Sequence, residues 1–356
     1  MKDHITLDNI AKKTGVSRAT VHRALHGKPG VSPTVAAEIC RLARELGYQP
    51  ASPSALGRSP RTIVAAFPES VGDNRHFYSQ LWLGLRSCLE ELSAYHLDVR
   101  EVPYGDGSED GFPARLKGIL KETGGAIDGL ITGGRIFKEG FAMLHYLSAS
   151  GVPVVLVTED DPEGEYLCSI QSDGFVDGQM AAELLVSQTG PHQSILMCAG
   201  DIQLYSNRSC MLGFEQYLAR MNHPRKLIKL YGYPERDHME DRLRILLNQE
   251  NSIGAFYSVN LRCSLFLARF LEKEGLAGKV RLIGSDLCPE SALFLKRQTM
   301  TAVLFRDPAL RARLGTKRLT DLLLHDMKPP SSSEVIRSSL ILESNLDRKF
   351  YRRKPL

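Results

Sequence analysis

From residue 62 onward, short apolar segments alternate with longer amphipathic ones, and this alternation constrains the fold more than any other feature of the chain. The short segments have the length of strands, whereas the longer ones repeat apolar residues at helical spacing, as Leu81, Leu85 and Leu89 do. Such alternation predicts parallel sheets covered by helices. The number of units indicates two doubly wound sheets, with a ligand site beyond the carboxyl ends of the strands. The expected strands are 63–67, 97–102, 129–132, 152–157, 193–198, 226–231, 253–258 and 280–284, and the expected helices are 77–95, 109–123, 141–150, 174–188, 206–221, 236–249 and 261–273.

The last part of this region predicts that the chain passes between two lobes. Residues 301–308 have the character of a crossover back to the first lobe, and a helix is expected over 309–326. The Pro- and Ser-rich residues 329–333 would form the next crossing, before a final strand over 334–342 in the second lobe. We therefore expect lobe 1 to comprise about 63–161 and 304–327, and lobe 2 about 162–303 and 328–356.

The Pro- and Ser-rich stretch 49–62 separates this core from a basic N-terminal region. Residues 1–62 contain ten Lys or Arg and four Asp or Glu, a net charge of +6, whereas the whole chain carries +4. A basic head on a nearly neutral body predicts that the head contacts a polyanion, although a merely solvated basic terminus would have the same composition. The expected domains are a DNA-binding domain at 1–48, a linker at 49–62, and a ligand-binding and dimerisation domain at 63–356.

The head carries the start and stop signals of three short helices. Thr6 and Ser17 can cap the first two helices, and Gly15 between them allows the tight turn that separates them. Ser32 precedes a proline and starts the third helix, which ends at Gly47. The head is therefore expected to be all-α.

The first two helices have the spacing of a helix-turn-helix. Ala11 is the small residue needed where the helices approach, Gly15 is the turn glycine, and Val21 is the apolar residue beneath the second helix. The second helix turns one face outward, and this face could contact base edges and phosphates in a major groove. A small three-helix protein-binding unit is the alternative. The outward residues are Arg18, Ala19, His22 and Arg23.

Residues 5–50 also contain a dense set of motif residues. These are 6–11, Gly15-Val16-Ser17, Thr20-Val21, Arg23, Val31-Ser32 and 46–50. In them the chain resembles the head of the lactose/galactose repressor (LacI/GalR) family. The resemblance implies that Arg18 and Ala19 mainly set the operator sequence, and an arginine here can pair with guanine while the alanine contacts a thymine methyl. The expected DNA-binding residues are Thr6, Ser17, Arg18, Ala19, Thr20, His22, Arg23 and Leu56.

The linker determines whether Leu56 contacts DNA. In the family that the head resembles, a short hinge helix forms here on DNA binding and inserts a leucine into the minor groove. Ser52 as the cap, Pro53 as the first helical residue and Leu56 could act in the same way. Pro60 departs from the usual pattern, and the spacing from Pro50 to Leu56 is short. A mobile tether with Leu56 unengaged is therefore the alternative.

Several polar residues follow the expected strands of the core. Arg208 stands five residues before Gly213, Asn260 comes just after the strand 253–258, and Asp286 ends a Gly-Ser-Asp triplet. In these positions the core resembles, more weakly than the head, the periplasmic sugar-binding type of protein. The resemblance implies a ligand cleft, and the three side chains suit hydroxyl groups because Asp accepts, Arg donates and Asn does both.

Further ligand-binding candidates lie at other strand ends or helix starts. They are Phe77 and Tyr78, which could pack on a sugar ring, and Asp160, Asp173 and Arg306. Every candidate except Asp160 and Arg306 has a purely structural alternative. These alternatives are a surface ion pair for Arg208, a cap or turn for Asp173, Asn260 and Asp286, and core or hinge packing for Phe77 and Tyr78.

Several classes of protein are disfavoured. The sequence lacks a Gly-x-Gly-x-x-Gly motif, a P-loop, a nucleophile elbow and a metal-binding His/Cys set, so we expect no cofactor, no metal and no enzymatic activity. The seven cysteines are scattered and odd in number, which indicates reduced thiols in a cytoplasmic protein. No apolar run approaches the roughly 18 residues that cross a bilayer, and the N-terminus lacks the apolar core of a signal peptide.

Together these features predict an all-α helix-turn-helix head joined to an α/β, two-lobed, periplasmic-binding-protein-like core. The expected function is sequence-specific transcriptional regulation, as a repressor by family expectation, under the allosteric control of a carbohydrate effector bound between the lobes. A homodimer would bind a near-palindromic operator in double-stranded DNA. The alternatives are an α/β enzyme fused to a DNA-binding head, which would turn over a bound sugar, and a nucleoid protein with equal affinity for all DNA.

Overall fold

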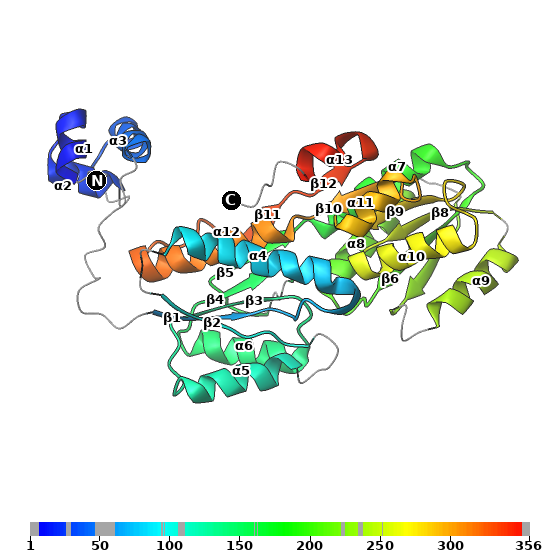
Figure 1. Ribbon diagram of the computed structural model, residues 1–356, viewed down its shortest axis with the longest axis horizontal. Coiled ribbons are helices and arrows are strands. Elements are labelled where there is room, and N and C mark those ends of the chain that lie inside the picture. Colours follow the sequence, from blue (N-terminus) through cyan, green and yellow to red (C-terminus); the bar gives the residue numbers. More distant parts are fainter. Residues whose placement is uncertain are drawn as a thin grey trace. The chain divides into compact units, whose positions relative to one another are not determined.

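The computed structural model describes residues 7–25, 30–46, 61–93, 95, 97–105, 111–159, 161, 163–221, 225–233, 238–250 and 252–350 (Figure 1). The chain forms two compact units, of which one covers Met1–Pro60 and the other covers Arg61–Ser93 and Leu97–Leu356. The predicted fold class, a helical head and an α/β core with two sheets, is confirmed in the two units.

The head consists of helices α1 (Leu7–Thr14), α2 (Arg18–Leu25) and α3 (Pro33–Glu45). Two of the expected caps are present, because Ser17 Oγ accepts from the Thr20 N–H at 3.1 Å and Ser32 Oγ accepts from the Val35 N–H at 3.4 Å. Gly15 has a φ of 68° between α1 and α2, a left-handed conformation that glycine adopts without strain. The buried side chains that hold the three helices together are Ile10, Val21, Ala24, Ile39 and Ala43.

The first sheet of the core is parallel throughout and has the strand order β11-β5-β4-β3-β1-β2. Side chains alternate between its faces, so that Ile63 packs with α4 and α12 while Val64 packs with α5 and α6 (Figure 1). The elements of this lobe are β1 (Arg61–Ala66), the 3-10 turn η1 (Gly72–Asn74), α4 (Arg75–Glu91), β2 (Leu97–Glu101), α5 (Gly111–Glu122), β3 (Gly129–Gly133), α6 (Lys138–Ala149), β4 (Val154–Val157), β5 (Cys168–Ser172), α12 (Pro308–His325) and β11 (Ser333–Ile336).

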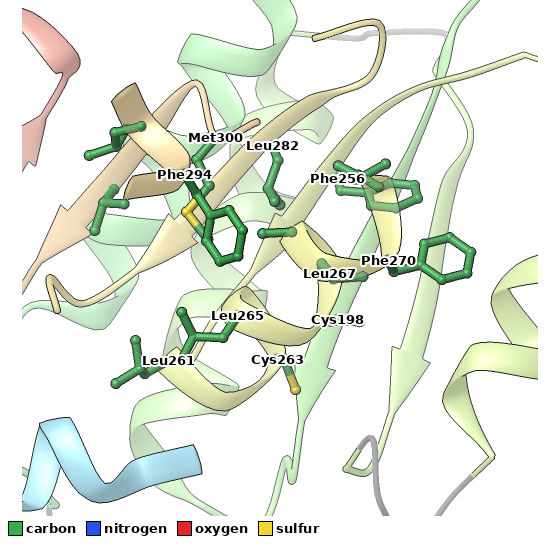
Figure 2. Packing of buried hydrophobic residues seen from close by; sticks show 14 of the residues in the cluster. Cys198, Phe256, Leu261, Cys263, Leu265, Leu267, Phe270, Leu282, Phe294 and Met300 are labelled. Carbon is green, nitrogen blue, oxygen red and sulfur yellow. The ribbon is translucent and has the colours of Figure 1, made fainter. Parts of the chain in front are cut away.

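The second sheet has the order β12-β10-β9-β8-β6-β7, and only β12 runs antiparallel to its neighbour. Helices α7 and α8 cover one face, and α9, α10 and α11 cover the other. Figure 2 shows Leu265 and Leu267 of α10 near Leu282 of β9 and Phe294 of α11. The elements are α7 (Gly174–Gln188), β6 (Ser194–Gly200), α8 (Tyr205–Arg220), β7 (Leu227–Tyr231), α9 (Met239–Gln249), β8 (Ile253–Ser258), α10 (Leu261–Lys273), β9 (Arg281–Ser285), α11 (Pro289–Lys296), β10 (Ala302–Phe305), β12 (Ser339–Ile341) and α13 (Glu343–Phe350).

The strand pairing corrects the expected lobe boundaries. The segment from 162 to Ser172 belongs to the first lobe rather than the second, because β5 pairs with β4. Strand β10 pairs with β9, so the passage back to the first lobe follows Phe305 instead of beginning at 304. The single strand expected over 334–342 is two strands, β11 in the first sheet and β12 in the second. A pattern of apolar residues identifies a strand, but it does not identify the distant strand that supplies its hydrogen bonds.

Candidate functional sites

The outward face of α2 lies as the sequence predicts. Arg18, Ala19 and Arg23 are exposed and His22 is half-buried, and these residues line a shallow depression together with Leu7. Arg18 Nη1 lies 3.6 Å from a carboxylate oxygen of Asp8, with both side chains mostly exposed. A solvated ion pair of this kind is weak, so it leaves the guanidinium of Arg18 able to bind another acceptor.

Two of the other expected DNA-binding residues have a structural role in the head. Ser17 Oγ lies 2.9 Å from Thr20 Oγ1 and also accepts from the backbone of Thr20, so both residues form the start of α2. Thr6 and Leu56 lie outside the described residues. The α2 face is therefore the part of the predicted DNA surface that the structure describes.

A cavity lies in the core, lined by segments that follow strands of both sheets. Asn74, Phe77 and Tyr78 come after β1, and Gly134, Arg135, Thr158 and Glu159 come after β3 and β4. The second lobe contributes residues after β6, β7, β8, β9 and β10, which are Leu204, Ser206, Asn207, Tyr233, Asn260, Leu261, Arg262, Asp286 and Arg306. Arg311 of α12 completes the lining from the first lobe. The carboxyl ends of the strands meet here, as expected for a doubly wound fold. Of the predicted ligand-binding residues, the cavity includes Phe77, Tyr78, Asn260, Asp286 and Arg306.

Asp286 and Arg306 form a buried ion pair in the wall of the cavity. Arg306 Nη2 donates to Asp286 Oδ2 at 2.5 Å and Nε donates to Oδ1 at 3.4 Å, and the two side chains are only 7% and 3% exposed. Burial is the largest single influence and lowers the pKa of Arg306, but the charge and hydrogen bonds of Asp286, together with the other acidic groups nearby, raise that pKa above its usual value. Asp286 was expected to accept a hydrogen bond from a ligand hydroxyl. In the structure both of its carboxylate oxygens already accept from Arg306.

Asn260 combines the two roles that the sequence left open. Its Oδ1 accepts from the Cys263 N–H at 2.9 Å and so caps α10. Its Nδ2 is buried and has no hydrogen-bond partner among the described residues. A Cβ on Gly200 would lie 2.4 Å from this nitrogen, so the glycine is required for the amide to lie where it does. Asn260 therefore caps a helix with its oxygen and keeps its amide nitrogen available at the cavity.

Phe77 and Tyr78 also have both roles. Their rings meet edge to face with centroids 5.7 Å apart, and both residues line the cavity. Tyr78 belongs to the buried core of the first lobe, whereas Phe77 packs against the cores of both lobes. The start of α4 thus joins the two lobes beside the cavity.

Three predicted ligand residues are not among those that line the cavity. Asp173 Oδ1 accepts from the Val176 N–H at 3.0 Å and caps α7, which was its structural alternative. Arg208 is exposed on α8, where its neighbours Ser206 and Asn207 face the cavity instead. Asp160 lies outside the described residues. Successive side chains on a helix point in directions about 100° apart. Arg208 therefore faces solvent although Asn207, one residue before it, lines the cavity.

The cavity also includes charged residues that were not predicted from the sequence, among them Glu159, Arg135 and Arg311. Glu159 is buried and its Oε1 accepts from Ser206 Oγ at 2.9 Å, and burial raises its pKa to about 7. Arg135 donates to Asp201 at 2.8 Å and so joins the loop after β3 to the loop after β6 of the other lobe. Glu159 follows β4 and Arg135 follows β3, so a search for polar residues just past the strand ends could have identified both.

Arg311 lies in the first turn of α12 and is 2% exposed. Its Cζ is 5.9 Å from the centre of the Phe77 ring. Burial, together with the nearby charge of Arg306, lowers the pKa of Arg311 to about 10, so the guanidinium remains charged at neutral pH. Its position inside a helix, rather than past a strand end, explains why the strand pattern did not reveal it.

The described residues contain no group of three or more His, Cys, Asp or Glu side chains that could hold a metal ion. Within the same residues, no helix has both the length and the apolar character that a membrane span requires.

Comparison with protein families matches both parts of the chain. Residues 140–326 match the periplasmic binding protein domain, and residues 6–51 match the head of the bacterial regulatory proteins of the lacI family. The chain belongs to the LacI family. The resemblance seen in the head residues is thereby confirmed.

Named relatives of this LacI-family regulator are themselves regulators. It is 26% identical to the HTH-type transcriptional regulator CelR of Thermobifida fusca over 79% of its own length and 82% of that protein. Its fold is similar to the lac repressor dimer bound to operator and the anti-inducer ONPF, with a TM-score of 0.63, 20% identity and coverage of 95% and 97% of the two chains. It is also similar to a solute-binding protein of an ABC transporter from Burkholderia graminis in complex with D-arabinose, with a TM-score of 0.71, 14% identity and coverage of 83% and 99%.

Proposed function

We propose that this LacI-family regulator represses transcription by binding a near-palindromic operator as a homodimer, and that a sugar-like effector in the interlobe cavity sets its affinity for DNA. The observation that carries the proposal is the match of residues 6–51 to the lacI-family head on a chain whose core holds a polar cavity between two lobes. The head supplies the DNA-binding surface and the core supplies the ligand site.

The exposed face of α2 supports sequence-specific binding. A helix in the major groove reads bases through a few side chains at its N-terminal end, and Arg18 and Ala19 are the first two residues of α2. A single head of three helices contacts too little DNA for tight specific binding, so two heads on a two-fold symmetric site are required.

The cavity supports control by a ligand. Residues from both lobes line it, and three segments of the chain connect the lobes, after Ser172, Phe305 and Ile336. A ligand that contacts both lobes favours one angle between them over another. A change in that angle in each subunit would alter how a pair of heads fits one operator.

The α2 face is tested with a duplex that the full-length protein selects from a random library. We expect Arg18→Ala to weaken binding to this duplex by about 1–3 kcal/mol, with a smaller loss on an unselected duplex at the same salt concentration. Arg41→Ala is the matched control, because Arg41 is an exposed arginine of α3 that pairs with Glu45 at 2.7 Å. Equal affinity of the wild type for all duplexes would support a nucleoid protein instead.

Ligand control is tested by thermal unfolding with a panel of sugars and sugar derivatives. A compound that binds the folded protein raises the unfolding midpoint by an amount that grows with its concentration. Each hit is then added to the selected-duplex assay, where we expect it to change the affinity for DNA. Hits that stabilise the protein and leave DNA affinity unchanged would argue against allosteric control.

A further inference from the structure

We propose that the ligand of the interlobe cavity is a polyhydroxylated anion whose carboxylate or phosphate binds the guanidinium of Arg311. The proposal rests on the proposed function, since it specifies the chemistry of the effector at the same cavity. It goes beyond a sugar-like ligand by requiring a negative charge at one defined position.

Arg311 is a buried cation in the wall of the cavity. The residue is 2% exposed and lines the cavity, yet its Nε and Nη2 have no hydrogen-bond partner among the residues that the structure describes. These two nitrogens form the side of the guanidinium that binds a carboxylate or phosphate through two parallel hydrogen bonds. A buried cation whose donors are unsatisfied is unfavourable, so a partner that enters the cavity would relieve this condition.

The acidic side chains near Arg311 are otherwise engaged. Asp286 uses both oxygens for Arg306. Asp177 Oδ2 accepts from Ser338 Oγ at 3.0 Å, and burial raises the pKa of Asp177 to about 6. Asp307 Oδ1 accepts from the Leu310 N–H at 3.0 Å and caps α12. Glu159 accepts from Ser206, and burial raises its pKa to about 7, so it carries only part of a negative charge at neutral pH. The charges of Asp286, Asp177 and Asp307 favour the charged form of Arg311, but none of these acids accepts a hydrogen bond from its Nε or Nη2 in the described part of the chain.

The charges around the cavity add up to a positive excess. Its lining contains four arginines, at 135, 262, 306 and 311, and two carboxylates, Glu159 and Asp286. Arg135 is paired with Asp201, which lies outside the lining, so the lining and this partner together are positive by one charge when Glu159 is ionised, and by more when it is protonated. A pocket with an excess of one sign of charge attracts ligands of the opposite sign.

The remaining groups indicate hydroxyls on the same ligand. The buried Nδ2 of Asn260 is a free donor among the described residues, and Thr158 and Asn207 add further polar groups to the lining. Phe77 lies beside Arg311 and lines the same cavity, so an aromatic side chain stands next to any ligand bound there. Sugar acids and sugar phosphates combine an anionic group with hydroxyls and a compact ring.

The test compares anionic compounds with their neutral counterparts on the full-length protein. D-glucuronate and D-galacturonate are compared with D-glucose and D-galactose at equal ionic strength, and D-glucose 6-phosphate and inorganic phosphate form the phosphate arm. We expect at least one sugar acid or sugar phosphate to raise the unfolding midpoint, and its neutral counterpart to do so at least about tenfold less potently. Comparison of the sugar acids with the phosphate compounds shows whether the anionic group of the ligand is a carboxylate or a phosphate.

The variant that removes the charge is Arg311→Met, and Arg313→Met is its matched control because Arg313 is exposed on the same helix and pairs with Glu91. We expect Arg311→Met to weaken binding of the anion at least about tenfold, and the control to leave it unchanged. The ligand-free variant should unfold at the same temperature as the wild type or higher, because it loses an unpaired buried charge. Circular dichroism and selected-duplex binding without ligand show that the variant is folded.

Three outcomes would overturn the inference. One is a neutral sugar that binds the wild type as well as its acid does, which would leave the proposed function intact. Another is that no anionic compound stabilises the wild type more than it stabilises Arg311→Met. The third is a large fall in the unfolding midpoint of ligand-free Arg311→Met, which would give Arg311 a structural role. Failure of the proposed function is separate, since it would be seen as a lack of duplex preference without any ligand.

Discussion

The two candidate functional surfaces of this regulator hold their arginines in opposite ways. On α2, Arg18 is mostly exposed and its contact with Asp8 is long and solvated. In the cavity, Arg306 is almost fully buried and makes a close, two-point contact with Asp286. A solvated arginine can exchange partners at little cost, which suits DNA binding, whereas a buried arginine has fixed geometry, which suits the recognition of one small molecule.

The largest effect is expected when one partner of the buried Asp286–Arg306 pair is removed. Asp286→Asn leaves Arg306 without a full counter-charge, and we expect it to lower the free energy of unfolding of the core by about 3–5 kcal/mol. Urea denaturation followed by circular dichroism measures the change. Glu91→Gln is the control, because it removes the partner of the exposed Arg313 and should cost less than about 1 kcal/mol. Equal losses in the two variants would remove the distinction between buried and exposed arginines.

A test of intermediate size uses the pH dependence of stability. Burial raises the pKa of Glu159 to about 7 in the folded protein, above its value in the unfolded chain. The folded state therefore binds the proton more tightly, and this contribution to stability is present at low pH and lost as the pH rises through about 7. We expect Glu159→Gln to be stabilised relative to the wild type by on the order of 2–3 kcal/mol at pH 8, and much less at pH 5.

Urea denaturation of both proteins at several pH values measures this difference. Asp177 is a second buried acid whose pKa is raised, to about 6, so the wild type retains some pH dependence after the substitution. The comparison between the two proteins isolates Glu159. A difference that does not change between pH 5 and pH 8 would show that this carboxyl is not held protonated by burial.

The smallest expected effect concerns the exposed pair of the head. Asp8→Asn removes the partner of Arg18, and we expect the affinity for a selected duplex to change by no more than about 1 kcal/mol. The change should become smaller at higher salt, because exposed charges are screened. Fluorescence anisotropy at two salt concentrations measures it. A loss as large as that expected for Arg18→Ala would mean that the pair positions Arg18 for DNA binding.

Local signals made the head predictable, whereas the cavity was predicted only in part. Ser17, Ser32 and Gly15 act on backbone groups a few residues away, so their roles can be inferred without knowing the fold. Asn260 and Asp286 were expected from the resemblance to periplasmic sugar-binding proteins and from their positions after strands, and both line the cavity because the ends of parallel strands converge in this class of fold. Arg208 and Asp173 were expected in the cavity on the same grounds, but one is exposed on its helix and the other caps its helix.

The sequence by itself determined the three helices of the head, the alternation of strands and helices in the core, and the edge of the sheets at which a ligand site forms. Only the tertiary structure decided which sheet β5, β10, β11 and β12 join, and which charges meet across the cavity. The physical reason is that strand pairing and ion pairs join residues far apart in the chain, as Arg135 and Asp201 are at a separation of 66 residues. Arg311 shows the same limit, because whether its Nε and Nη2 find hydrogen-bond partners among the described residues depends on everything packed around them.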